Sequence, residues 1–151
     1  MTESTQVLAS HSKRLGGALI DCLIMMAVSF PVMLVTGAFR QITEQRRMTF
    51  VQGAFYSLFG LAVFLCINGY FLAKQGQTVG KKIVGTRIVA YSDGQILPFG
   101  KLLCLRYLPI ALIAMIRVIG QILILADILF IFRADKRCIH DLIAGTKVVD
   151  A

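Results

Sequence analysis

Four polar residues lie inside long apolar runs of this sequence: Asp21, Asn68, Arg106 and Asp127. Each lies five to seven residues from a basic residue at the edge of its run, which corresponds to about 8–10 Å along a helix. Charges inside a bilayer are costly, so they mark either an ion pathway or a buried pair. We therefore predict one intramembrane polar layer, which either binds a proton or small cation or fixes helix register through Asp–Arg pairs.

Arg106 is the expected counter-ion of Asp21 or Asp127, because a guanidinium group matches a carboxylate in a bidentate geometry. Arg14 lies two helical turns before Asp21 on the same helix face and is expected to offset part of its charge. One arginine between two carboxylates leaves an acidic group in excess. Such a group could exchange a proton or a small cation.

Three apolar blocks must position this layer, at residues 15–39, 51–73 and 102–132. A helix needs about 20 apolar residues to cross a bilayer, so the first two blocks each predict a full crossing. The third is too long for one crossing and short for two, and Gly120 near its middle favours a bend. The alternative is an interfacial helix over 98–109 followed by a single crossing.

The predicted fold is an all-α membrane protein, a small bundle of two transmembrane helices and a helical hairpin or re-entrant pair. The predicted helices span residues 15–39, 51–73, 102–116 and 119–132 of a single membrane domain, 14–151. A disordered tail is expected over residues 1–13, a cytoplasmic loop over 74–101 and a C-terminal tail over 133–151.

Composition agrees with this class. Hydrophobic residues make up 57 % of the chain and the mean hydropathy is +0.76, above the range of soluble domains. The net charge of +8 comes mainly from Lys and Arg that flank the apolar blocks, where they orient the chain and attract anionic lipids rather than nucleic acid. The 4 cysteines form no CxxC pair, so we expect no metal site and no cofactor. No HExxH or GxSxG motif occurs, and we expect no enzyme.

A sequence echo suggests that two short strands pair with each other. Residues 84–90 and 144–150 both contain Gly-Thr, a basic residue and two β-branched residues, a pattern that favours strands. Pairing requires both segments on one side of the membrane. The positive-inside rule agrees, because an even number of crossings places most loop and tail Lys and Arg in the cytoplasm with both termini.

Three motifs in order connect these features to a known family. Residues 14–21 read RLGGALID, residues 76–89 read GQTVGKKIVGTRIV and residues 137–149 read RCIHDLIAGTKVV. With these motifs the chain resembles the RDD family of membrane proteins from Arg14 to Val149. The family's last aspartate corresponds to Asp127 or Asp141. The other residues that match the family motifs are Gly80, Lys81, Gly85, His140, Gly145 and Thr146.

The resemblance implies a multi-pass protein of the bacterial inner membrane, with transport of an unknown ligand, including cation–proton exchange. A homo-oligomer is expected, because so few helices cannot enclose a pathway alone. The competing hypothesis is a non-transporting accessory protein that binds a partner or anionic lipid through its basic face. The glycine-rich segment 76–82 lacks the Walker spacing and is expected to form a tight turn. Asp141 is expected to cap a helix or to pair with nearby basic residues: Arg133, Lys136 and Arg137, or Lys81 and Lys82.

Overall fold

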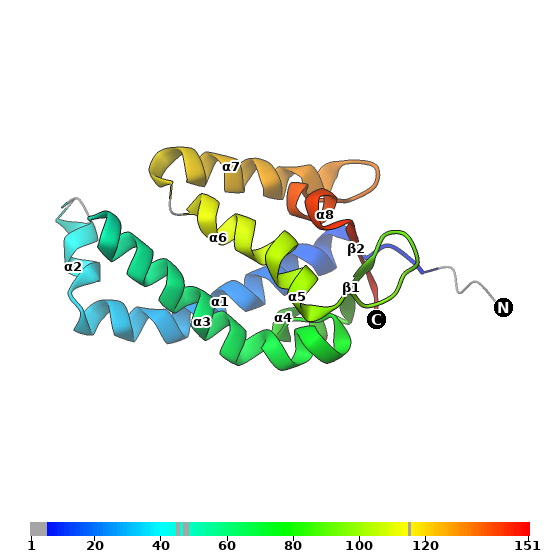
Figure 1. Cartoon of the computed structure of the whole chain (residues 1–151), viewed down its shortest axis with the longest axis horizontal. Coiled ribbons are helices and arrows are strands. Elements are labelled where there is room, and N and C mark those ends of the chain that lie inside the picture. Colours follow the sequence, from blue (N-terminus) through cyan, green and yellow to red (C-terminus); the bar gives the residue numbers. More distant parts are fainter. Residues whose placement is uncertain (1–5, 45, 47–48, 115) are drawn as a thin grey trace.

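The computed structural model describes residues 6–44, 46, 49–114 and 116–151. Two helices in it are long and apolar enough to cross a membrane, α1 (His11–Val35) and α3 (Phe50–Gln75). They are joined through a short helix, α2 (Ala38–Thr43), at one end of the molecule (Figure 1). Their apolar windows carry no buried residues, so their side chains present the apolar surface that lipid requires. The chain is a helical membrane protein, as its sequence predicts.

Sequence caps fix where the two long helices begin. The Ser10 side chain accepts a hydrogen bond from the backbone N–H of Lys13 at the start of α1. Thr49 and Gln52 form a capping box at the start of α3, each side chain bonding the other residue's backbone N–H. Such caps satisfy the N–H groups that have no partner in the first helical turn.

The third apolar block folds back on itself as a helical hairpin, as predicted. Its first arm contains α5 (Phe99–Leu102), a π-helical turn (Leu103–Tyr107) and α6 (Leu108–Ala114). The second arm is α7 (Arg117–Leu129), ending in a 3-10 turn (Phe130–Phe132). The two arms run side by side (Figure 1). The single straight helix after residue 109 that the alternative requires is not formed, because α6 and α7 are separate helices.

The bend of the hairpin does not lie at Gly120. Gly120 lies in the first turns of α7, and a Cβ atom there would come 2.1 Å from the Ile113 carbonyl oxygen of the other arm. The glycine is required because the two arms approach each other closely, and the chain reverses before it, between α6 and α7.

Two helix–strand units complete the fold. The first is α4 (Val79–Ile83) followed by β1 (Thr86–Ala90), and the second is α8 (Ile139–Ala144) followed by β2 (Thr146–Asp150). The strands pair antiparallel, with Thr86 opposite Asp150 and Ala90 opposite Thr146. The predicted strand pair is confirmed, whereas the predicted glycine-rich turn over 76–82 is wrong in part, because α4 begins at Val79.

Of the predicted disordered tail of residues 1–13, residues 1–5 lie outside the described part of the chain, and residues 7–13 do not fit the prediction. Leu8 forms a bridge to Val149, and the Ala9 N–H donates to the Val148 carbonyl at 3.1 Å. Ala9 is completely buried, and α1 already begins at His11. Residues 7–9 therefore lie along the edge of β2 that does not pair with β1. The mostly polar sequence of residues 1–10 did not indicate this contact.

The hydrophobic core lies at the end of the bundle that carries the sheet. Its buried members come from the N-terminal segment, α3, both strands, α5 and the loop before it: Ala9, Leu72, Ile88, Leu97, Leu102 and Val148. This core holds the start of α1, the end of α3 and both helix–strand units together (Figure 1). As a result, the segments 74–101 and 133–151 pack into the bundle rather than extending from it as a free loop and tail.

Candidate functional site

Asp141 lies at the centre of a buried ion cluster. Its side chain has no exposed surface, and the Arg14 Nη2 atom donates to its Oδ2 atom at 2.6 Å. Arg106 Nη1 donates to the other carboxylate oxygen, Oδ1. Both arginine side chains are at least nine-tenths buried. Asp141 therefore joins α1, the π-helical turn of the hairpin and α8.

This cluster corrects three predicted pairings. Arg106 contacts neither Asp21 nor Asp127, because α8 brings Asp141 between it and Arg14. Arg14 likewise pairs with Asp141 instead of offsetting Asp21. The expectation that Asp141 caps a helix is confirmed, because it accepts from the Cys138 N–H at the start of α8. The alternative pairing with neighbouring basic side chains is wrong, although Arg137 Nη2 donates to the Asp141 backbone carbonyl at 3.2 Å.

Thr146 completes the hydrogen bonding of the cluster. Its hydroxyl donates to Asp141 Oδ1 at 2.9 Å and accepts from Arg106 Nη1 at 2.6 Å. Burial alone would raise the pKa of Asp141, but the charges of Arg106, His140 and Arg14 outweigh burial and hold that pKa well below its usual range. The lowered pKa favours the ionised form of Asp141, which binds two cations and suits a structural centre.

Asp21 is placed differently, against the N-terminus of α4. Its Oδ1 atom accepts from the Gly80 N–H at 2.7 Å, and its Oδ2 atom accepts from the Thr78 hydroxyl at 2.5 Å. Both donors are neutral. Among the described residues, Asp21 makes no ion pair with a basic side chain. It is thus a half-buried carboxylate of α1 that accepts hydrogen bonds from two neutral donors, and Lys81 is the basic side chain whose charge interacts with it.

Close packing of two glycines makes this contact possible. A Cβ atom on Gly80 would lie 2.1 Å from the Gly17 carbonyl oxygen and 2.8 Å from the Asp21 carboxylate carbon. Only a residue without a side chain lets α4 approach α1 so closely. The role of Gly80 as a motif residue thus has a physical basis.

Asn68 supports the same short helix from α3. Its Oδ1 atom accepts from the Val79 N–H at 2.8 Å, next to the N–H that Asp21 accepts. The Thr78 hydroxyl accepts from the Lys81 N–H at 3.2 Å. The free N–H groups of α4 are therefore satisfied by side chains from two apolar helices and its own N-cap.

Lys81 extends from α4 toward the buried charges. Burial and the charge of Arg106 lower its pKa to about 8, although Asp21 and Asp141 act in the opposite direction. Lys82 instead lies 4.4 Å from the centre of the Phe71 ring at the end of α3. The two lysines therefore have different environments, and Lys82 is the one that lies against an aromatic ring.

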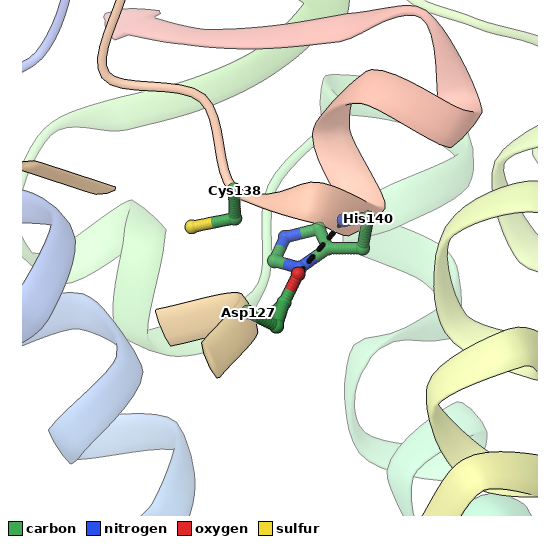
Figure 2. A group of neighbouring side chains, drawn as sticks. All are labelled: Asp127, Cys138 and His140. Carbon is green, nitrogen blue, oxygen red and sulfur yellow. Dashed lines mark hydrogen bonds and ion pairs between the residues drawn. The ribbon is translucent and has the colours of Figure 1, made fainter. Parts of the chain in front are cut away.

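Asp127 pairs with His140 rather than with Arg106. Its Oδ1 atom accepts from the His140 backbone N–H at 2.8 Å, and its Oδ2 atom lies 2.6 Å from the ring Nδ1 (Figure 2). Burial and the charge of Arg106 lower the pKa of His140, although Asp127 and Asp141 favour the protonated ring. The contact holds the end of α7 against the first turn of α8.

Cys138 is a site residue that the sequence analysis did not single out, because the cysteines form no CxxC pair. It is the N-cap of α8, and its backbone N–H donates to Asp141 Oδ2 at 3.3 Å. Its sulfur lies close to the Asp127–His140 pair (Figure 2). Burial raises the pKa of its thiol to about 11. The spacing Cys-x-His of residues 138–140 was the available signal, but Asp127 is distant in the sequence.

The predicted layer is thus divided between the two short helices. Asp21 and Asn68 bind the first turn of α4, while Arg106 and Asp127 bind residues of α8. Gly85 and Gly145 are the left-handed residues that link each helix to its strand, with φ of 68° and 63°. Chemically, the arrangement offers one carboxylate without a direct ion pair among the described residues, one fixed ion cluster and one Asp–His–Cys group.

Comparisons with known proteins agree with these motifs. The model of the RDD family matches residues 8–145. An uncharacterized protein of Haemophilus influenzae is 32 % identical over 100 residues, which cover 66 % of this chain and 62 % of that protein. The uncharacterized protein YckC of Bacillus subtilis is 34 % identical over 140 residues, covering 91 % of this chain and 82 % of that protein. No solved structure matches the chain.

Proposed function

The chain belongs to the RDD family, and from this premise we propose that it exchanges a small cation for protons across the membrane. In this proposal Asp21 is the group that binds the cation or the proton. Arg14 and Arg106 do not take part directly, because Asp141 holds both of them. They fix the helices around the exchanging carboxylate.

The surroundings of Asp21 carry this proposal. The carboxylate lies on a helix that is otherwise apolar over a membrane-spanning length, and it accepts only from the Thr78 hydroxyl and the Gly80 N–H. Neutral donors stabilise a carboxylate less than an ion pair does, so it can bind a proton or a cation in turn. Ionisable groups of this kind mark ion pathways in membrane proteins.

The proposed location is the bacterial inner membrane, with several crossings and with both termini in the cytoplasm. The pairing of β1 with β2 supports this topology, because it gathers the N-terminal segment, the loop after α3 and the C-terminal strand at one end of the bundle. We further propose a homo-oligomer, in which neighbouring copies enclose the pathway that two long helices and a hairpin leave open to lipid.

Flux measurements on purified protein in liposomes test the proposal. Liposomes that contain a pH-sensitive dye and an outward proton gradient are supplied with Na⁺, K⁺ or Ca²⁺ outside. The wild-type protein should dissipate the gradient on addition of one of these cations. Asp21→Asn should abolish this response, because an amide can neither lose a proton nor neutralise a cation.

Asp93→Asn is the matched control, because Asp93 is an exposed carboxylate in the loop after β1. It should leave the response unchanged. Elution of both variants as folded protein in detergent separates a loss of exchange from a loss of structure. An exchange response that survives in folded Asp21→Asn protein would contradict the proposal.

A second function, the binding of anionic lipid by an accessory protein, is favoured by a cluster of basic and aromatic side chains at the sheet. Arg137 lies 4.2 Å and Lys147 lies 5.7 Å from the centre of the exposed Tyr91 ring. Tyrosine and basic residues together are typical of the membrane interface. Lys147→Gln together with Lys82→Gln should reduce retention of phosphatidylglycerol during purification, with no change in cation exchange.

A further inference from the structure

We propose that Asp127, Cys138 and His140 form a binding site for Zn²⁺ that joins the second arm of the hairpin to α8. The candidate ligand atoms are a carboxylate oxygen, the Cys138 sulfur and a ring nitrogen of His140, all within 4.8 Å of one another. Figure 2 shows the three side chains gathered between the end of α7 and the start of α8. The site is separate from Asp21, so it does not depend on the proposed exchange.

The donor set suits zinc chemically. Thiolate, imidazole and carboxylate are the three side-chain groups that bind Zn²⁺ in proteins, and three protein ligands with an open fourth position form a common type of zinc site. Softer or harder donor sets would favour other ions, such as Cu⁺ for several sulfurs or Mg²⁺ for oxygens alone. One thiolate and one carboxylate also neutralise the charge of the ion, which matters in a buried place.

Burial makes the group more than a chance surface cluster. Cys138 is 7 % exposed and Asp127 is 9 % exposed. Within the described part of the chain, the only hydrogen-bond partners of the Asp127 carboxylate are the backbone and ring of His140. A buried carboxylate with a single neighbouring residue to stabilise it leaves room for a cation.

A second carboxylate is in position to orient the histidine. His140 Nε2 lies 3.9 Å from Asp141 Oδ2, while Nδ1 faces Asp127. Histidine ligands of metals commonly donate their other ring N–H to a carboxylate, which sets the tautomer. Ligation through Nδ1 would place the remaining ring proton on Nε2, toward Asp141. The ion would therefore connect α7 to the Asp141 cluster.

Metal binding requires only small movements. Asp127 Oδ2 and His140 Nδ1 are now 2.6 Å apart, whereas two ligands of one tetrahedral zinc ion are separated by about 3.3 Å. The two atoms would move apart by less than the length of a covalent bond as the ion replaces their hydrogen bond. The Cys138 thiol loses its proton to solvent when the Zn–S bond forms, so binding releases one proton to the buffer.

Titration of the full-length protein in detergent with Co²⁺ tests the site, with an untagged chain freed of metal beforehand. Cobalt takes the place of zinc and gives an absorption band from sulfur-to-metal charge transfer only when a thiolate is bound. We expect this band to saturate at a single ion per chain and to disappear when Zn²⁺ is added.

Variants assign the ligands. Cys138→Ser should remove the band, while serine remains a good N-cap so that α8 is retained. His140→Gln and Asp127→Asn should weaken Co²⁺ binding by more than the about 10–100-fold loss typical of second-shell residues. The matched controls are Cys66→Ser and His11→Gln, which alter a cysteine on α3 and the other histidine of the chain. Both controls should bind as the wild type does.

Two results would overturn the proposal. The first is wild-type protein that develops no thiolate band at saturating Co²⁺, whatever the variants do. The second is a band that persists in Cys138→Ser protein, which would assign the thiolate to another cysteine. In either case the Asp127–His140 contact is a hydrogen bond that fixes α8 and nothing more.

Discussion

Asp21 and Asp127 make equivalent contacts with the two short helices α4 and α8. Asp21 accepts the N–H of Gly80 at 2.7 Å, and Asp127 accepts the N–H of His140 at 2.8 Å. Gly80 and His140 are each the second residue of the short helix that precedes a strand of the sheet. In both cases a carboxylate from an apolar helix caps a short helix, α4 or α8, that packs back into the bundle.

The equivalence ends at the second carboxylate oxygen. Asp21 accepts there from the Thr78 hydroxyl, whereas Asp127 meets the imidazole of His140. Asp21 is therefore a carboxylate whose hydrogen-bond donors are neutral, whereas Asp127 is a carboxylate beside a histidine and a thiol. This difference is why we assign cation–proton exchange to the first and metal binding to the second.

Replacing Gly80 by alanine should destabilise the protein by about 1–3 kcal/mol, the usual cost of overpacking. The added methyl group would clash with the Gly17 carbonyl oxygen, which is backbone and cannot move aside. Thermal unfolding in detergent measures the effect. Gly69→Ala in α3 is the control, because nothing lies within 4 Å of its added Cβ. An equal unfolding temperature for the two variants would contradict the packing of α4 on α1.

Asp141→Asn should prevent accumulation of folded protein or cost about 3–5 kcal/mol, because it leaves Arg14 and Arg106 buried without their counter-ion. Yield in the membrane fraction and unfolding temperature are the measurements. Asp150→Asn, which removes a half-exposed ion pair with Lys13, should cost no more than about 1 kcal/mol. Similar yields and unfolding temperatures for the two variants would show that the ion cluster around Asp141 does not stabilise the fold.

The lowered pKa of Lys81 predicts a pH dependence of stability. The folded protein releases the lysine proton at about 8, whereas the unfolded chain keeps it up to 10.5. Between these pH values the unfolded state binds more protons than the folded state. The free energy of unfolding should therefore rise as the pH is raised from about 8 to 10.5, and it should decrease again when the pH is lowered to 8.

Lys81→Gln should remove this rise in alkaline stability, since no proton is then bound or released at position 81. Lys82→Gln is the control, because the neighbouring Lys82 is exposed, and it should keep the wild-type pH profile. Unfolding by urea at several pH values between 7 and 10.5 provides the comparison. A Lys81→Gln profile that coincides with the wild type would place Lys81 in solvent.

Single cysteines in a cysteine-free chain test the topology. Ser92 lies in the turn after β1 and Ala151 directly follows β2, so Ser92→Cys and Ala151→Cys should both react with an impermeant maleimide from the cytoplasmic side. Thr43→Cys, at the end of α2, should react from the opposite side. Labelling of Ser92→Cys and Ala151→Cys from different sides would refute an even number of crossings.

The sequence alone determined the elements whose character is local. The length and hydropathy of residues 15–39 and 51–73 predicted α1 and α3, because a bilayer demands a long apolar helix. The repeated Gly-Thr-basic pattern predicted β1, β2 and their pairing. Its β-branched residues favour strands, and the similarity of the two segments suggested that they pair with each other. The three ordered motifs identified the family.

Only the tertiary structure decided which charges meet. The sequence analysis placed residues by their depth along straight helices and therefore paired Arg106 with Asp21 or Asp127. It did not consider that α4 and α8, which lie outside the apolar blocks, pack back into the bundle. Asp141 is 127 residues from Arg14 and 35 from Arg106, and α8 carries it between them. A buried carboxylate bonds to whichever donors the packing of α4 and α8 places beside it, and that packing depends on contacts across the whole chain.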